Sequence, residues 1–186
     1  MVESCDCYFY TIGLRLGIVN IVKYEKMFGI GERTGVELDD EKKGLLPTPG
    51  WKKKMYGSAW QKGETLNISI GQGFLLTTPI QLASVFCGIA NGGMIPKPRL
   101  VLKVMCGDSE EKTFPPQPIK RFKISSETIT LLKKSLVDVV NDPNGTGLKA
   151  KVNGILIAGK TGTAQVVSKK KNEQKKEDIP WHLRDH

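Results

Sequence analysis

The stretch NGILIAGKTGTAQVV, residues 153–167, constrains the chain most, because it matches two motifs that belong to different folds. From Gly154 to Thr161 it fits G-x-x-x-x-G-K-[ST], the pattern of a phosphate-binding P-loop. A P-loop needs small residues between its glycines and a helix directly after them. Here residues 155–158 are Ile-Leu-Ile-Ala, typical of a buried strand, and strand formers follow Thr161. A P-loop is therefore only an alternative interpretation.

The same stretch contains Lys160-Thr161-Gly162-Thr163, which we interpret as part of a strand over residues 154–167. Alternation along a strand predicts Lys160 and Gly162 on one face, with Thr161 and Thr163 on the other. Gly162 leaves the strand edge bare, so that an extended peptide can lie against it. Lys160 offers a positive charge to a carboxylate, and Thr163 offers a hydroxyl. The pattern favours a strand that binds a peptide.

Composition sets broad limits on the chain. Its 186 residues, 39% hydrophobic and 25% charged, predict one globular domain or a large piece of one. The net charge of +9 permits an anionic partner but indicates first a basic, solvated surface. The sequence contains no secretory leader and no apolar run of the roughly 18 residues that a membrane span needs. The spacing of the four cysteines suits neither a disulfide scaffold nor a zinc site.

Local signals predict an α+β chain. Thr78 and Pro79 are typical of a helix start, and residues 91–93 (Asn-Gly-Gly) are typical of a helix end. The remaining expected elements, in chain order, are a helix over 4–28 broken at Gly13 and Gly17, a loop over 36–64, a strand over 99–106, a proline loop at 115–118 and a helix from Ser125 to Asn141.

Longer segments carry a family resemblance. They occur in collinear order over nearly the whole chain, at residues 4–10, 28–35, 69–74, 78–82, 143–146, 159–165 and 183–186. Together they resemble class B penicillin-binding proteins, and more narrowly the elongation-type D,D-transpeptidases of the rod-shape machinery. The resemblance implies the fold of penicillin-binding proteins and serine β-lactamases, here a helical cluster with part of an antiparallel sheet. It also implies that residues 1–186 are a partial transpeptidase domain.

The resemblance implies acyl transfer in peptidoglycan synthesis. A serine attacks the D-Ala-D-Ala end of a stem peptide, an amine resolves the acyl-enzyme, and β-lactams acylate the same serine. Ser4 and Asp6 match the S-x-[ND] element, where Ser4 relays a proton to the leaving nitrogen and Asp6 orders the network. Lys160 would hold Ser4 and the substrate carboxylate.

The other family roles fall on two short segments. Thr161 and Thr163 would bind the carboxylate region of the substrate, with Gly162 between them in the catalytic strand. The backbone N–H of Thr163 would be one oxyanion-hole donor. The family role of Gly71, Gln72 and Gly73 is structural support of the site. Cys5 lies where some relatives place a metal ligand, yet we expect no metal and no cofactor.

The nucleophile motif S-x-x-K of this family should precede Ser4. Two such strings occur, at 109–112 and 168–171, but both follow Ser4 in what we interpret as polar loops, so we regard them as chance. We therefore expect no nucleophile here, and an inactive internal piece that also lacks the strands after Lys160. In the full-length protein we expect stem peptide, β-lactams and rod-complex proteins as partners, and a place at the periplasmic face of the bacterial inner membrane.

Two other function classes stay open at this stage. The first is the nucleotide-binding P-loop protein, which ATP-dependent thermal stabilisation would favour. The second is a non-catalytic module that keeps the family surface for cell-wall partners. The aromatic and basic segment 51–62 has a composition that also occurs in nucleic-acid-binding proteins. The resemblance places a similar loop before the Gly71-Gln72-Gly73 element, so we expect no nucleic acid.

Overall fold

The computed structural model describes residues 1–162, which form five α-helices and four short strands. The helices are α1 (Asp6–Met27), α2 (Pro49–Tyr56), α3 (Lys62–Ser69), α4 (Pro79–Ala90) and α5 (Ser126–Asn141), and a 3-10 turn, η1 (Leu148–Ala150), follows α5. The strands are β1 (Met94–Pro96), β2 (Lys103–Cys106), β3 (Ser109–Thr113) and β4 (Pro118–Arg121). The predicted α+β class is confirmed. Predictions for Thr163, for strand residues 163–167 and for the 168–171 string lie outside the described residues.

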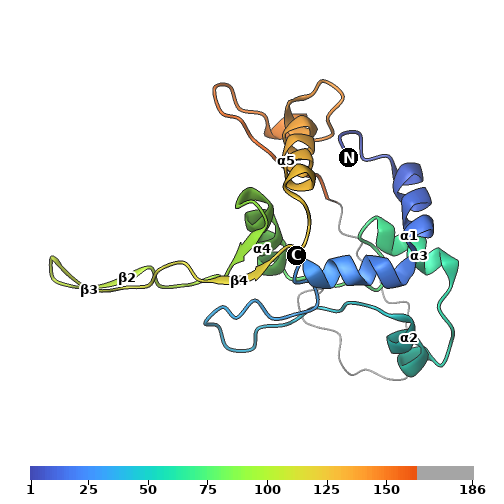
Figure 1. Ribbon diagram of the computed structural model, residues 1–186, viewed down its shortest axis with the longest axis horizontal. Helices are drawn as coiled ribbons and strands as arrows, with labels where there is room; N and C mark the ends of the chain where they lie inside the picture. Colours follow the sequence, from blue (N-terminus) through green and yellow to red (C-terminus); the bar gives the residue numbers. More distant parts are fainter. Residues whose placement is uncertain (163–186) are drawn as a thin grey trace.

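The strands form one irregular ribbon. β1 pairs antiparallel with β4, and β2 pairs antiparallel with β3. Between the two pairs, Lys97 N donates to Gln117 O at 2.7 Å and Phe114 N donates to Leu102 O at 2.9 Å. The ribbon projects away from the helices (Figure 1). The strand predicted over 99–106 begins only at Lys103, because the nearby prolines at 98, 115 and 116 have no N–H to give to a ladder.

The apolar core lies where the base of this ribbon meets α4 and α5. Ile95, Phe122 and Ile129 are its buried centre, and Phe28 packs edge-to-face on Phe122 with ring centroids 4.7 Å apart. Gly88 allows the Phe122 ring to lie close to α4, because a Cβ at this position would stand 2.7 Å from the ring. Burial of several large side chains of this kind contributes most of the favourable free energy of folding in this region.

Three predicted helices form as their local signals indicate. Thr78 Oγ1 accepts from Gln81 N at 3.3 Å, and the helix α4 ends before Gly92 and Gly93, both of which have positive φ. Ser125 caps α5 by accepting from Thr128 N at 3.3 Å. The helix α1 breaks at Gly17, where φ is 70° and ψ is 158°.

The predicted break at Gly13 is wrong. Gly13 stays helical and buried because Ser69 of α3 lies directly against it, where any Cβ would overlap the serine side chain. The absent side chain serves helix packing at this position, not a change of backbone direction.

The loop predicted over 36–64 is also wrong, because α2 and the start of α3 lie within it. Both helices are short, so polar contacts at their starts help to stabilise them. Thr48 Oγ1 caps α2 by accepting from Trp51 N at 3.0 Å, and Glu64 Oε2 accepts from Gln61 N at 2.7 Å at the start of α3. An ion pair between the buried Lys52 and Glu64 joins the two helices.

The long α1 does not have the character of a membrane span. Across residues 1–162, no helix combines the length and the apolar character that crossing a membrane requires.

Candidate active site

The two predicted motifs meet in space although they lie at opposite ends of the described chain. Lys160 Nζ donates a hydrogen bond of 2.6 Å to Ser4 Oγ, across 156 positions of sequence. The same ammonium donates to Thr161 Oγ1 and to Thr161 O, each at 3.1 Å. An ammonium has three N–H groups and no acceptor, so these contacts occupy all of its donors. Ser4, Lys160 and Thr161 therefore form one polar cluster.

Thr146 belongs to this cluster, although the sequence did not single it out as a site residue. Its Oγ1 lies 3.2 Å from Ser4 Oγ and 3.1 Å from Thr161 Oγ1, and it donates to Val2 O at 3.3 Å. The segment 143–146 contributed to the family resemblance, but no local pattern says that its threonine faces Ser4. Contact between residues 142 positions apart is visible only in the fold.

The C-terminal part of α5 holds both Thr146 and Lys160 in place. Gly147 N donates to Val139 O at 2.8 Å, and Gly159 N donates to Leu136 O at 3.0 Å. Asn141 Nδ2 adds a bond of 2.8 Å to Ile157 O. The last four carbonyls of a helix have no partner within the helix, and here Gly147 satisfies that of Val139. The residue after Thr146 and the residue before Lys160 are thus fixed to one rigid element.

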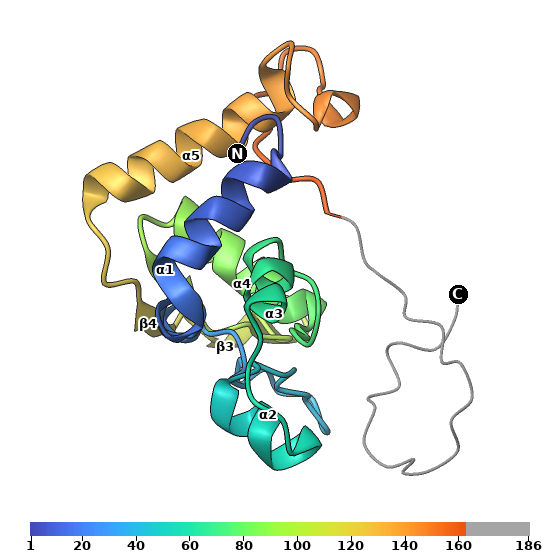
Figure 2. The same ribbon diagram turned by 90° about the vertical axis from the view of Figure 1, so that its right-hand side faces the viewer.

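The N-terminal residues close the cluster from the other side. Thr146 N donates to Val2 O and Ser4 N donates to Met1 O, each at 3.3 Å. Ser4 has φ of 49°, a left-handed conformation that is uncommon for serine and that surrounding contacts must hold. The helix α1 then begins at Asp6. Figure 2 shows the N-terminus beside the end of α5 and the chain that follows it.

The strand predicted over 154–167 is not present in its described part. Residues 154–162 form no strand and make only an isolated bridge between Val152 and Ile155. Ile155 and Leu156, predicted as a buried strand, are 61% and 75% exposed. A strand needs a partner strand and a cover, and the described residues supply neither at this position.

The predicted alternation of side chains fails for the same reason. Lys160 and Thr161 were expected on opposite faces, yet Nζ of Lys160 bonds to Oγ1 of Thr161. Without strand geometry, both side chains turn toward Ser4 and Thr146. This convergence gives the cluster a cation surrounded by three hydroxyl groups.

The other predicted site residues lie outside the cluster. Asp6 is the first residue of α1, and its side chain makes no hydrogen bond or ion pair within residues 1–162. Gly162 follows Thr161 and is exposed. Gly71 and Gly73 both have positive φ in the turn after α3, where Gln72 N donates to Asn67 O at 2.9 Å. That turn follows Ser69, which packs on α1, so a supporting role of residues 71–73 remains a prediction.

Within residues 1–162, neither an S-x-x-K string nor a metal site adds to the cluster. Ser109 and Lys112 lie in β3, so the expectation of a loop there is wrong, because the hairpin with β2 draws them into a strand. In the part of the chain that the structure describes, no three His, Cys, Asp or Glu side chains gather closely enough to hold a metal ion.

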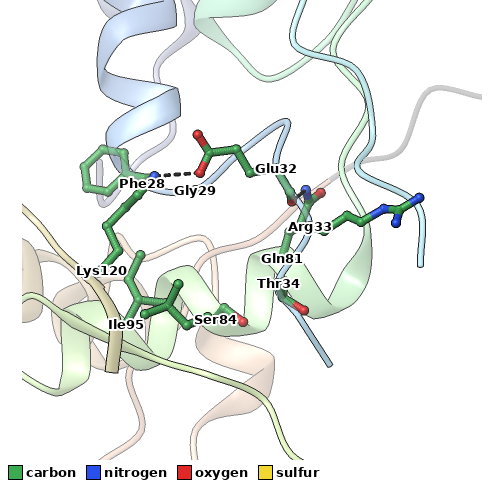
Figure 3. A pocket seen from close by; sticks show the side chains of 10 residues that line it. Phe28, Gly29, Glu32, Arg33, Thr34, Gln81, Ser84, Ile95 and Lys120 are labelled. Carbon is green, nitrogen blue, oxygen red and sulfur yellow. Dashed lines mark hydrogen bonds and ion pairs between the residues drawn. The ribbon is translucent and has the colours of Figure 1, made fainter. Parts of the chain in front are cut away.

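A cavity of about 30 Å³ lies elsewhere, between the loop after α1, α4 and the ribbon (Figure 3). Gln81 lines it and is fully buried; its Nε2 donates to Glu32 O at 2.6 Å and to Lys43 O at 3.0 Å. Its Oε1 accepts from Thr78 N at 2.8 Å, and Lys120 pairs with Glu32 at the rim. These contacts join α4 to the loop before α2. The cavity includes no residue of the Ser4–Lys160 cluster.

Comparison with known proteins agrees with this geometry. Residues 1–183 match the family model described as "Penicillin binding protein transpeptidase domain". The peptidoglycan D,D-transpeptidase MrdA of Salmonella typhimurium is 35% identical over 187 residues, which is 99% of this chain and 30% of that relative. The chain thus spans less than a third of the length of this relative.

Solved structures give the same result. The penicillin-binding protein PBP2 of Helicobacter pylori, in its complex with MreC, superposes with a TM-score of 0.76 and 34% identity, over 88% of this chain and 29% of that one. PBP2 of Pseudomonas aeruginosa, in complex with WCK 5153, superposes with a TM-score of 0.75 and 34% identity, over 89% of this chain and 37% of that one. The motifs, the fold and the matched relatives agree, and the chain belongs to the penicillin-binding protein transpeptidase family, among relatives of the elongation type.

Proposed function

We propose that this chain supplies the proton-relay half of a peptidoglycan D,D-transpeptidase site, and that it acts within the full-length protein. The observation that carries the proposal is the 2.6 Å bond from Lys160 Nζ to Ser4 Oγ. A hydroxyl that accepts from an ammonium can give up its own proton and take another from its partner. That is the chemistry of a general acid beside a leaving amine.

The reaction balances as an acyl transfer. The hydroxyl of a serine in the full-length protein attacks the carbonyl of the penultimate D-alanine, and its proton passes to a base beside it. The C–N bond breaks, and the leaving nitrogen takes the proton of the Ser4 hydroxyl. Ser4 recovers a proton from Lys160. The proton that the attacking serine gave up then replaces the one that Lys160 has lost. A second amine then releases the acyl group by the reverse sequence.

Lys160 and Thr161 have a further role in binding. The substrate ends in a carboxylate, and charge-assisted hydrogen bonds from an ammonium and a hydroxyl are the strong contacts for such a group. Lys160 is exposed in the described residues, so an incoming carboxylate can reach it and replace its bond to Thr161 O. In this proposal Thr163 adds its hydroxyl and its N–H to the same region.

Partners and location follow from the family. The Helicobacter pylori relative is solved in complex with MreC, so we propose that the full-length protein assembles with elongation-complex proteins. We also propose that it works at the periplasmic face of the inner membrane. The P-loop and the non-catalytic module gain no support, whereas the contact of Lys160 with Ser4 agrees with the roles that the transpeptidase motifs imply.

The test is the intact mass of the full-length protein after incubation with benzylpenicillin, followed by peptide mapping. We expect one stoichiometric adduct on a serine outside residues 1–186, and no adduct on this chain alone. An adduct on Ser109 or Ser168 would overturn the assignment of roles. Complete absence of an adduct on the full-length protein would overturn the proposed function.

A further inference from the structure

The hydrogen bonds around Thr146 can all form at once in only one order of the hydroxyl protons. Val2 O is a carbonyl and can only accept, so the hydroxyl of Thr146 gives it its single proton, over 3.3 Å. Thr146 Oγ1 must then accept from both neighbouring hydroxyls. Ser4 Oγ lies 3.2 Å away and Thr161 Oγ1 lies 3.1 Å away.

The hydrogen bonds of Lys160 agree with the same order of donors and acceptors. Its ammonium donates to Ser4 Oγ and to Thr161 Oγ1, so each hydroxyl already accepts one bond and is free to donate its own proton. Thr146 Oγ1 is the acceptor within reach of both hydroxyls. When all of these hydrogen bonds form at once, the protons point one way, from Lys160 through Ser4 or Thr161 to Thr146 and then to Val2.

Thr146 is also held firmly enough to impose this order. A Cβ on the preceding Gly145 would overlap the Val139 carbonyl, so the backbone lies directly on the end of α5. The following Gly147 donates to that carbonyl at 2.8 Å. A hydroxyl on an anchored backbone can hold the strained Ser4, whose own backbone has few other contacts.

We propose that Thr146 is a positioning residue of the transpeptidase site. It accepts a hydrogen bond from the Ser4 hydroxyl between turnovers. This bond fixes the Ser4 rotamer from which the hydroxyl proton passes to the leaving nitrogen. This role rests on the proposed function and adds to it a residue outside both recognised motifs. The proposal predicts that removing the Thr146 hydroxyl slows acylation more when the leaving group needs a proton.

The experiment compares two acyl donors on the full-length protein. Benzylpenicillin has a nitrogen leaving group that must be protonated, whereas an acyl-D-alanyl thioester releases a thiolate that needs no proton. Acylation rates are measured for the wild type, Thr146→Val, Thr146→Ser and the control Thr130→Val. Thr130 is an exposed threonine of α5 whose hydroxyl, within residues 1–162, bonds only to Ser126 O, at 2.9 Å.

We expect Thr146→Val to slow acylation by benzylpenicillin on the order of ten- to a hundredfold, which is less than the full loss of proton-transfer assistance because Thr146 acts only through Ser4. The thioester rate should change by less than about threefold, and Thr146→Ser should restore most of the benzylpenicillin rate, since it keeps the hydroxyl. Thr130→Val should behave as wild type with both donors.

Other outcomes overturn the inference in distinguishable ways. Equal slowing with both donors would make Thr146 a structural residue only. Unchanged rates with both donors would remove it from the site. A wild type that neither donor acylates would overturn the proposed function itself, and this inference with it.

Discussion

The core around Phe122 and the cluster around Ser4 are stabilised in opposite ways. Ile95, Phe122 and Ile129 are 4% to 5% exposed and attract one another without directional bonds. Lys160 and Thr146 are exposed and are held by hydrogen bonds whose donors and acceptors have a fixed order. The core should therefore tolerate a change of chemistry that keeps volume, whereas the cluster should not tolerate loss of a hydroxyl at constant volume.

The helix α5 belongs to both regions. Ile129, near its start, is in the core, while the carbonyls of Leu136 and Val139, near its end, hold the loops of the cluster. Damage to the core should therefore reach the site through α5. Damage to the cluster should leave the core intact, because no core side chain depends on those hydroxyls.

The largest expected effect is on the core. Phe122→Ala removes a buried ring that contacts Phe28 and fills the space opposite Gly88, and it should cost about 3 to 5 kcal/mol. Hydrogen exchange of the amides of α4 and α5 in the full-length protein measures this loss locally. Phe122→Leu, which keeps most of the volume, should cost clearly less. Equal protection in wild type and Phe122→Ala would contradict the description of this core.

A buried polar residue should give the next effect. Gln81→Met keeps the length of the side chain but leaves Thr78 N–H and two carbonyls, Glu32 O and Lys43 O, without their partner. The expected cost is about 1 to 3 kcal/mol, measured by exchange of the amides of α4. The exposed Gln117→Met in the ribbon is the matched control and should change stability little. A Gln81→Met protein as stable as wild type would show that the hydrogen bonds of Gln81 do not stabilise the protein.

Substitutions at two glycines test whether the cluster can be disturbed without disturbing the core. Gly145→Ala forces the loop away from the Val139 carbonyl and should move Thr146 out of the cluster, with acylation falling about tenfold. Gly63→Ala on α3 is the control, since a Cβ there meets nothing. Core amides should keep their protection in both variants. Loss of core protection in Gly145→Ala would break the proposed separation of the two regions.

The smallest expected effect depends on pH. Burial raises the pKa of the Glu25 carboxyl from 4.5 to about 7, and its Oε2 is buried without a hydrogen-bond partner in the described chain. The folded state thus binds the proton more tightly than the unfolded state, so stability should fall as pH rises from 4.5 to about 7 and stay lower above it. Because Glu25 is partly exposed, we expect only about 1 kcal/mol.

Glu25→Gln should remove this dependence and stabilise the protein above pH 7. The measurement is the unfolding midpoint of the full-length protein at pH 5 and at pH 8, with the exposed Glu111→Gln as control. A stability difference between the two pH values that is equal in wild type and Glu25→Gln would contradict this account.

The sequence predicts elements well where a local signal sets them. Thr78 with Pro79 and Ser125 define the starts of α4 and α5, and Gly17 marks the break in α1. The start of α2 repeats the same signal, since Thr48 and Pro49 are an N-cap and a first helical residue. The sequence nevertheless predicts a loop there, because Pro47, Pro49 and Gly50 together resemble one and the helix is too short for a periodic apolar face.

The site is only partly readable from the sequence. Resemblance identifies Ser4 and Lys160 because each lies in a motif of consecutive residues. The structure brings the two side chains into contact. Thr146 has no motif of its own around Ser4, and its role depends on the end of α5 and on Val2. The strand expected at Lys160 fails because strand formers make a strand only beside a partner, which local sequence cannot supply.

The most direct test of the central claim is a double-mutant cycle on the full-length protein. The rate of acylation by benzylpenicillin is measured for wild type, Ser4→Ala, Lys160→Met and the double variant. If the two residues form one proton-relaying unit, each single change should slow acylation by at least about a hundredfold, and the double variant should be little slower than either. Effects that multiply in the double variant would show that Ser4 and Lys160 act independently, and would contradict the account.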